Sequence, residues 1–407
     1  MTSTPEWPSV APACSWLVAE IQGLEGAFSF PEKLLQKIWF QHDFDCSHLA
    51  THDGRRLRLR HPGRWNQLGG PDFKDAILSF DDLGEVVGDV ELHVRAEDWK
   101  FHGHADDPAY DRVVLHVVLF PVGPDHVTLG RDGKHLPVLE LLPRLTCDLE
   151  QYAMEDAVET LARRPASQIR SELGHLRLAE LEVLLRARAL DRWTRKVHHA
   201  RQRIGRLGWE GACHQTVLEI LGYRFNRVPM LRVATAWPLA CWKDPAFDLS
   251  AVVASERWAV QGVRPLNHPR LRLQQYARWT AVMAEWPDQL KEWGSALPAI
   301  DPTRPTREVR RQFDFPAQRE TIWRELCAET IGGSRLDNLI CDGFLPLLAA
   351  SSSSDLQGLW FHWYPGTLPS VLHRSLRQLG IFSQPLAPAA HGPAQGLLGW
   401  LIEQRCY

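Results

Sequence analysis

Acidic and histidine side chains alternate with apolar ones in the run Gly88-Asp-Val-Glu-Leu-His93. This period of two predicts a β-strand. Because side chains on a strand alternate between its faces, Asp89, Glu91 and His93 should share one face, within about 7 Å of each neighbour. Adjacent carboxylates repel one another and lose hydration, so a fold usually keeps them together only around a cation or a proton.

A tight loop rich in glycine and proline places Asp72 just before the next strand upstream. We therefore predict that Asp72, Asp89 and Glu91 bind a hard divalent ion, Mg²⁺ or Mn²⁺, with open water positions. Such an ion would support hydrolysis of a phosphodiester, with Asp72, Glu91 and His93 as the catalytic residues and His93 positioning the water or the phosphate. The alternative is that these side chains form the solvated face of a half-exposed sheet.

Histidines 93, 102, 104 and 116 fall close together in the sequence. They could complete the carboxylate site, or form a separate zinc-type or iron-type cluster, because imidazole suits those metals. A histidine inside a strand is also often a hydrogen-bonded core residue. The secondary candidates for the site are Asn66, His102, His104, Asp107, Tyr110 and His116.

Short elements of alternating type must position these residues. Pro31 to Asp43 has helical spacing of apolar residues, whereas Arg56 to Arg60 alternates as a strand does. Further strands are expected at Ala76–Phe80 and Val86–Arg95, which form a hairpin, and at Val113–Phe120, which reads as buried on both faces. Asp107-Pro108 predicts a short helical turn before the last strand.

Helical periodicity dominates from about Cys147 onward. The sequence therefore predicts an α+β fold, with a nuclease-like α/β domain of mixed sheet and flanking helices followed by a mainly α-helical domain. The expected organisation is a lead-in over residues 1–30, the α/β domain over 31–146 and the helical domain over 147–407. Separate helices are expected at Leu173–Val197 and Cys213–Leu221, the second ending at Gly222.

The composition of the 407-residue chain restricts its class. A net charge of −3 gives no global attraction to polyanions, and the eight cysteines form no CxxC pair. The sequence opens without the pattern of a signal peptide and has no apolar run long enough to span a membrane. We expect a cytoplasmic protein, and the sequence leaves its oligomeric state open.

Basic residues precede the acidic stretch. Their positions allow contacts with the phosphates of a nucleic acid, although they could equally form a solvated face. The predicted nucleic-acid-binding residues are Arg56, Arg58, Arg60 and Arg64.

Several motifs carry a resemblance to a bacterial family known only as a domain of unknown function. They include Gly70-Pro-Asp-Phe73, Gly88–His93, His102-Gly-His104 and Asp107-Pro-Ala-Tyr110, and they continue into Arg264–Pro269 and Arg272-Leu273, so that the resemblance covers most of the chain.

The order of helix, three strands, helix and strand also resembles the PD-(D/E)XK phosphodiesterase superfamily. Pro71-Asp72 matches the first motif and Glu91-Leu-His93 the second, with His93 in place of the lysine. This resemblance implies a metal-dependent nuclease. The alternatives are a non-catalytic scaffold that binds nucleic acid or protein on such a core, and a histidine-ligated metal enzyme of other chemistry.

Overall fold

The computed structural model describes residues 31–66, 68–145, 149, 152–153, 156, 166–256, 258–260, 267–352, 354–383 and 387–404. It divides the chain into two compact units, residues 1–153 with 403–407 and residues 154–402. The predicted lead-in, residues 1–30, lies outside the described residues. Among the described helices, none combines the length and apolar character needed to cross a lipid bilayer.

A mixed sheet forms the first unit, in the strand order β1-β2-β4-β5-β6-β9, with β3 paired to β4. The strands β2, β4 and β5 are antiparallel, whereas β6 runs parallel to β5 and β9 parallel to β6. Their bounds are β1 Leu49–Ala50, β2 Arg56–His61, β3 Arg64–Trp65, β4 Phe73–Phe80, β5 Gly84–His93, β6 Val113–Val118 and β9 Val138–Glu140, and a separate pair consists of β7 Thr128–Leu129 and β8 His135–Leu136.

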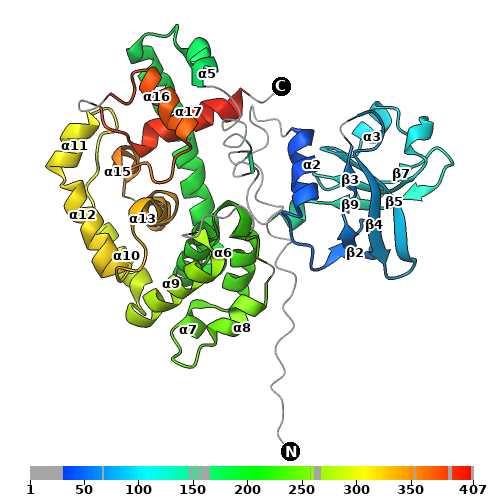
Figure 1. Ribbon diagram of the computed structural model, residues 1–407, viewed down its shortest axis with the longest axis horizontal. Coiled ribbons are helices and arrows are strands. Elements are labelled where there is room, and N and C mark those ends of the chain that lie inside the picture. Colours follow the sequence, from blue (N-terminus) through cyan, green and yellow to red (C-terminus); the bar gives the residue numbers. More distant parts are fainter. Residues whose placement is uncertain are drawn as a thin grey trace, which may run out of the picture. The chain divides into compact units, whose positions relative to one another are not determined.

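Helix α2 (Glu32–Gln41) flanks this sheet (Figure 1). Its apolar stripe, Leu34, Leu35, Ile38 and Trp39, is buried, and the Trp39 indole N–H donates to the carbonyl of Pro62 at 3.1 Å. The helix ends at His42, which adopts the left-handed conformation with φ 54°. The predicted mixed sheet with helices is confirmed.

The crossover between the parallel strands β5 and β6 positions most of the histidines. It contains α3 (Asp98–Phe101) and the 3₁₀ turn η2 (Pro108–Tyr110). Asp107 caps η2 by accepting a hydrogen bond from the backbone N–H of Ala109 at 2.8 Å. Because a parallel connection must return to the start of the next strand, the segment after α3 passes back over β5.

A β-bulge in β4 displaces the expected pairing. Phe73 lies opposite Val90, but Ala76 lies opposite Gly88, so β4 has one extra residue in this interval. Asp75 takes up the bulge with φ 57°, and its backbone N–H donates to Asp89 Oδ1 at 3.0 Å. Asp89 therefore stabilises the bulge that precedes the regular part of β4.

The second unit is helical, as predicted, and its longest helix is α6 (Leu178–Ala236). The two helices expected at 173–197 and 213–221 fall largely within this element, on either side of Gly208, where the backbone is non-helical. The backbone is also non-helical at Tyr223 and Asn226, and the break at Tyr223 directly follows the predicted stop at Gly222.

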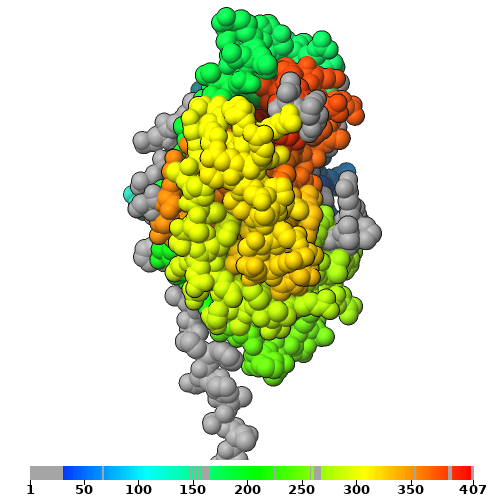
Figure 2. Space-filling view, turned by 90° about the vertical axis from the view of Figure 1, so that its left-hand side faces the viewer, coloured from blue at the N-terminus to red at the C-terminus, as the bar shows by residue number. Residues whose placement is uncertain are grey.

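The remaining helices pack against α6 and one another, and Figure 2 shows one face of this unit. The core holds fully buried aromatic side chains, among them Trp279, Trp286 and Trp360. The helices are α5 Ala166–Leu173, α7 Leu239–Trp242, α8 Leu249–Ala254, α9 Pro269–Val282, α10 Trp286–Ser295, α11 Thr306–Gln312, α12 Phe315–Thr321, α13 Gly333–Asn338, α14 Leu345–Ser351, α15 Gln357–His362, α16 Ser370–Gln378 and α17 His391–Glu403, with π-helical turns η5 Ile322–Leu326 and η6 Leu339–Phe344.

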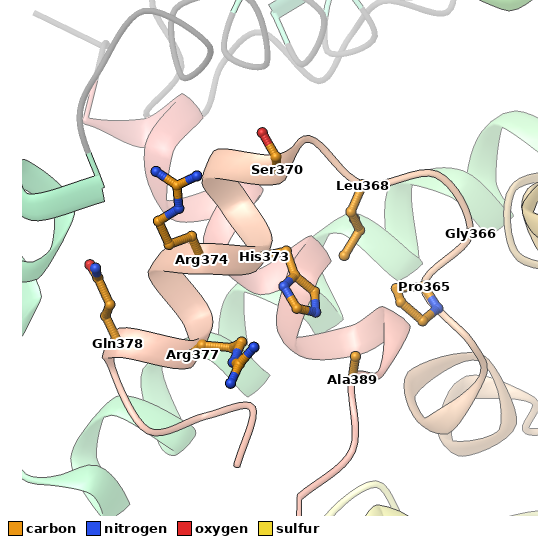
Figure 3. Close-up of a pocket in the computed structure, with 9 residues that line it drawn as sticks. All are labelled: Pro365, Gly366, Leu368, Ser370, His373, Arg374, Arg377, Gln378 and Ala389. Carbon is orange, nitrogen blue, oxygen red and sulfur yellow. The ribbon is translucent and has the colours of Figure 1, made fainter. Parts of the chain in front are cut away.

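A pocket of about 820 Å³ lies along α16. Figure 3 shows His373, Arg374 and Arg377 extending from this helix, and all three line the pocket. Both arginines are exposed to solvent.

Candidate metal centre

Three histidines of the first unit converge on one point. His93 ends β5, whereas His102 and His104 follow α3 in the crossover. One ring nitrogen from each lies within 4.8 Å of the other two, an arrangement that could hold a metal ion. His93 and His104 are buried and His102 is exposed, so the group is reachable from solvent on one side.

Glu91 adds a carboxylate to the imidazoles. Its Oε1 lies 3.3 Å from His104 Nε2 and 3.7 Å from His93 Nε2, and His93 Nε2 lies 3.2 Å from His102 Nδ1. Two ligand atoms that share one tetrahedral ion at about 2.1 Å are roughly 3.4 Å apart. These three spacings thus fit the coordination shell of a single ion.

The His104 ring reinforces this interpretation. Its Nε2 is buried and has no hydrogen-bond partner among the described residues, although it points at a carboxylate oxygen. The ring stacks on Tyr110, with centroids 3.9 Å apart, and its edge meets Trp99. These two aromatic rings fix the orientation of His104, which leaves Nε2 facing the other ligand atoms.

Burial favours the neutral form of three of these histidines by lowering their pKa values, and neutral imidazole is the form that binds metals. Burial lowers the pKa of His93 to about 2 and that of His116 to about 3, with neighbouring histidines adding to both shifts. Burial also lowers the pKa of His104. The imidazoles of His93, His104 and His116 therefore do not balance the charge of the acids beside them.

Three carboxyl groups share this environment. Burial, reinforced by repulsion from Glu91, raises the pKa of Asp72 to about 7. Burial raises the pKa of Glu91 to about 8 and that of Glu32 to about 7, and the Glu32 shift is reinforced by Asp72. The sequence gives no signal for Glu32, because it lies on α2, far from the motif, and only the packing of α2 brings it near Asp72.

Hydrogen bonds hold Asp72 against β5. Gln36 Nε2 donates to Asp72 Oδ1 at 2.6 Å, and the backbone N–H of Leu92 donates to Oδ2 at 3.2 Å. In return the Asp72 N–H donates to Glu91 Oε2 at 2.9 Å. Asn66 fixes the preceding loop, since its Nδ2 donates to the carbonyl of Pro71 at 2.9 Å.

A chain of hydrogen bonds leads away from His93. His93 Nδ1 lies 2.9 Å from His116 Nε2, His116 Nδ1 lies 3.0 Å from Thr128 Oγ1, and His126 Nε2 lies 3.1 Å from the same oxygen. If His93 Nε2 binds an ion, Nδ1 must carry the proton and donate to His116, which then donates to Thr128. This chain fixes both the tautomer and the orientation of His93.

The other residues predicted for the site make their contacts outside the metal centre. Asp89 accepts a hydrogen bond from the β4 bulge, Asp107 accepts one from η2, and Arg64 pairs with Asp75. Arg56, Arg58 and Arg60 are exposed on β2. The structure thus brings together Asp72, Glu91, His93, His102, His104, Tyr110 and His116, and adds Glu32.

A family model described as "Protein of unknown function (DUF2851)" matches residues 32–254. The chain belongs to this family. The DUF2851 match begins at Glu32 and contains every residue of the metal centre, together with α6 and α8. No curated protein and no solved structure matches the chain, so no nuclease relative supports the resemblance to the PD-(D/E)XK superfamily.

Proposed function

We propose that the chain is a metal-dependent hydrolase of phosphodiester bonds, whose ion is bound by Glu91, His93, His102 and His104. The observation that carries the proposal is the buried, unpartnered His104 Nε2, 3.3 Å from Glu91 Oε1. A buried polar atom without a partner costs free energy, as does a buried carboxylate without a cation. One divalent ion between these groups would remove both costs.

The donor set favours a transition metal over Mg²⁺. Carboxylates alone would suit Mg²⁺, but three imidazoles with one carboxylate suit Mn²⁺, Fe²⁺ or Zn²⁺ better. Of the two ions expected from the sequence, Mn²⁺ therefore remains the better candidate. His93 is the ligand whose orientation is fixed most firmly, because His116 and Thr128 hold its other nitrogen.

A bound ion would activate a water molecule and stabilise negative charge on a phosphoryl oxygen. Asp72 and Glu32 lie beside the ligands and have pKa values of about 7, so each can hold or release a proton at neutral pH. Asp72 is held by Gln36 and the Leu92 N–H, which suits a group that must keep a fixed position relative to the water.

The arginines of β2 support a polyanionic substrate. The register pairs Arg58 with Ser79 and Ser79 with Glu85, and even spacing along β5 puts Arg58 on the same face of the sheet as Glu91. Arg58 lies toward the end of β4 that is remote from Asp72. A ligand that contacts both must extend over several residues of the sheet, as a polynucleotide does.

Metal analysis and a cleavage assay on the full chain test the proposal. We expect about one transition metal ion per chain, and loss of that ion in the double variant His102→Ala/His104→Ala. His52→Ala is the matched control, because His52 also contacts a carboxylate, Glu140 at 3.1 Å, outside the metal centre. Single-stranded and double-stranded DNA and RNA are then incubated with the Mn²⁺, Fe²⁺ and Zn²⁺ forms.

Cleavage that disappears in the double variant and persists in the control is the expected result. Stoichiometric metal without cleavage of any of the four substrates would refute the hydrolase and leave a metal-stabilised binding scaffold. A chain that binds no transition metal would refute the metal centre itself.

A further inference from the structure

Two buried arginines of the second unit lie side by side. Arg272 on α9 is 7% exposed and Arg335 on α13 is 6% exposed. Arg272 Nη2 donates to Asn267 Oδ1 at 2.8 Å, and Arg335 Nη2 donates to the same oxygen at 3.3 Å. One neutral amide oxygen thus accepts hydrogen bonds from two guanidinium groups.

The positive charge of this pair is not balanced by a carboxylate. Among the described residues the other hydrogen-bond acceptors are neutral, Gln275 Oε1 for Arg272 and the carbonyl of Ile220 for Arg335. The Nε atoms of both arginines are buried without a hydrogen-bond partner. Asp342 acts on Arg335 only from a distance and is itself bonded to Lys196 at 3.0 Å.

The two positive charges repel each other, which raises the free-energy cost of burying either guanidinium group. Burial and repulsion from Arg335 lower the pKa of Arg272 to about 10, although guanidinium groups usually stay far above this range. The Tyr223 ring lies 4.7 Å from the Arg335 guanidinium and offsets part of the cost through a cation–π contact. A ring is a weak substitute for an anion, so the pair still lacks a full counter-charge.

The start of α9, a helix of 14 residues that begins at Pro269, lies beside the pair. Pro269 has no N–H and the Arg272 N–H donates to the carbonyl of His268 at 3.1 Å, so the backbone N–H groups without an acceptor inside the helix are those of Arg270 and Leu271. Opposite lies the break in α6 at Tyr223, where the chain departs from helical geometry. Asn267 and Arg272 lie beyond residues 32–254, which match the family model.

We propose that Arg272 and Arg335, held by Asn267 at the start of α9, form a binding site for a phosphate group. Guanidinium groups offer a planar fork of donors that matches phosphate oxygens, and two forks with a helix N-terminus suit a tetrahedral oxyanion better than a planar carboxylate. The site goes beyond the proposed hydrolase and does not depend on it, because it lies in the other unit.

The pocket along α16 provides a matched contrast. Arg374 and Arg377 are exposed there, so water can solvate their charges without any bound anion (Figure 3). Variants of these two residues remove the same charge from the same unit. They therefore distinguish a buried phosphate site from a general effect of positive charge.

Thermal unfolding of the full chain in sodium phosphate, against sodium chloride and sodium acetate at equal ionic strength, tests the proposal. We expect the midpoint of wild type to rise with phosphate concentration, since a ligand that binds only the folded state stabilises it. Arg272→Met and Arg335→Met should lose this response, and Arg374→Met and Arg377→Met should keep it.

The sign of the stability change in phosphate-free buffer gives a second measurement. Arg272→Met should leave the midpoint equal or higher, because a desolvated and repelled charge is replaced by an apolar side chain of similar length. An unchanged wild-type midpoint in phosphate would refute the site, as would an equal response to acetate. A phosphate response that survives in both buried variants would refute it too.

Discussion

The two units bury charge in opposite ways. The metal centre of the first unit gathers Glu32, Asp72 and Glu91 beside neutral histidines, and the cluster of the second unit gathers two arginines around an amide oxygen. The second unit also contains a part-buried charge that is paired, since Arg319 bonds both carboxylate oxygens of Asp337. Each of the two proposed ligands would balance the excess charge of its own cluster.

Two buried histidines show the same contrast at single residues. His214 in the second unit has a partner for each nitrogen, the Tyr276 hydroxyl at 2.7 Å and the carbonyl of Trp237 at 3.0 Å. His104 in the first unit has none for Nε2. The first pattern is that of a structural core residue, and the second is consistent with the proposed metal ligand.

The largest expected effect is that of Glu91→Gln. Removal of the charged ligand should weaken metal binding by at least about 100-fold, measured by calorimetric titration. Without metal, the variant should be more stable, by up to roughly 3 kcal/mol at pH 7, because a carboxyl whose pKa is raised to about 8 in the fold costs stability as pH rises above 4.5.

Glu140→Gln is the control for this change, because Glu140 pairs with His52. It should leave metal affinity unchanged. If Glu91→Gln keeps wild-type affinity, Glu91 is not a ligand and the proposed coordination set is wrong.

The contrast between the two histidines predicts a pH effect in the second unit. Burial lowers the pKa of His214 to about 4, below the unfolded value of 6.5. The unfolded chain therefore binds the proton first, and the contribution of His214 to stability, present above pH 6.5, is lost as pH falls toward 4, by roughly 3 kcal/mol. In His214→Gln, urea unfolding should vary less with pH in this window, and an unchanged slope would contradict the account.

Thr128→Val should affect the metal centre from outside the ligand set. Loss of the hydroxyl leaves His116 Nδ1 without its partner, so His93 is held less firmly, and metal affinity should fall by about 10-fold to 100-fold. Thr128→Ser, which keeps the hydroxyl, should keep most of the wild-type metal affinity. Equal losses in both variants would indicate a packing effect instead of a hydrogen-bonded chain.

The smallest effect is expected for Asp89→Ala. Asp89 accepts from the Asp75 N–H, so the variant should lose stability near the lower end of the roughly 1–3 kcal/mol typical of an unsatisfied donor. Its metal affinity should not change. A loss of metal binding in this variant would return Asp89 to the ligand set predicted from the sequence.

Local patterns predicted much of the first unit. Alternation along β5 placed Glu91 and His93 on one face, and Asp107-Pro108 predicted the η2 turn. The same alternation could not reveal the bulge at Asp75, because the extra residue lies on the partner strand. The backbone N–H of this bulge donates to Asp89, a contact that the prediction for Asp89 did not include. The alternation of one strand carries no information about a hydrogen-bond acceptor that a bulge in the neighbouring strand requires.

Tertiary packing decides the rest. Glu32 reaches the site only because α2 flanks the sheet, and His102 and His104 reach Glu91 only because the crossover passes back over β5. Arg272 and Arg335 lie far apart in the sequence, so neither residue predicts the other. The helix expected to end at Gly222 is followed by a break at Tyr223, but local patterns did not predict the helical turns of α6 beyond it.

Anomalous diffraction from crystals of the full chain grown with Zn²⁺ or Mn²⁺ tests the central claim most directly. The account predicts one strong peak in the first unit, about 2.0–2.2 Å from nitrogens of His93, His102 and His104 and from an oxygen of Glu91. A peak bound by Asp72 and Asp89 without the histidines, or no peak in this unit at saturating metal, would contradict it.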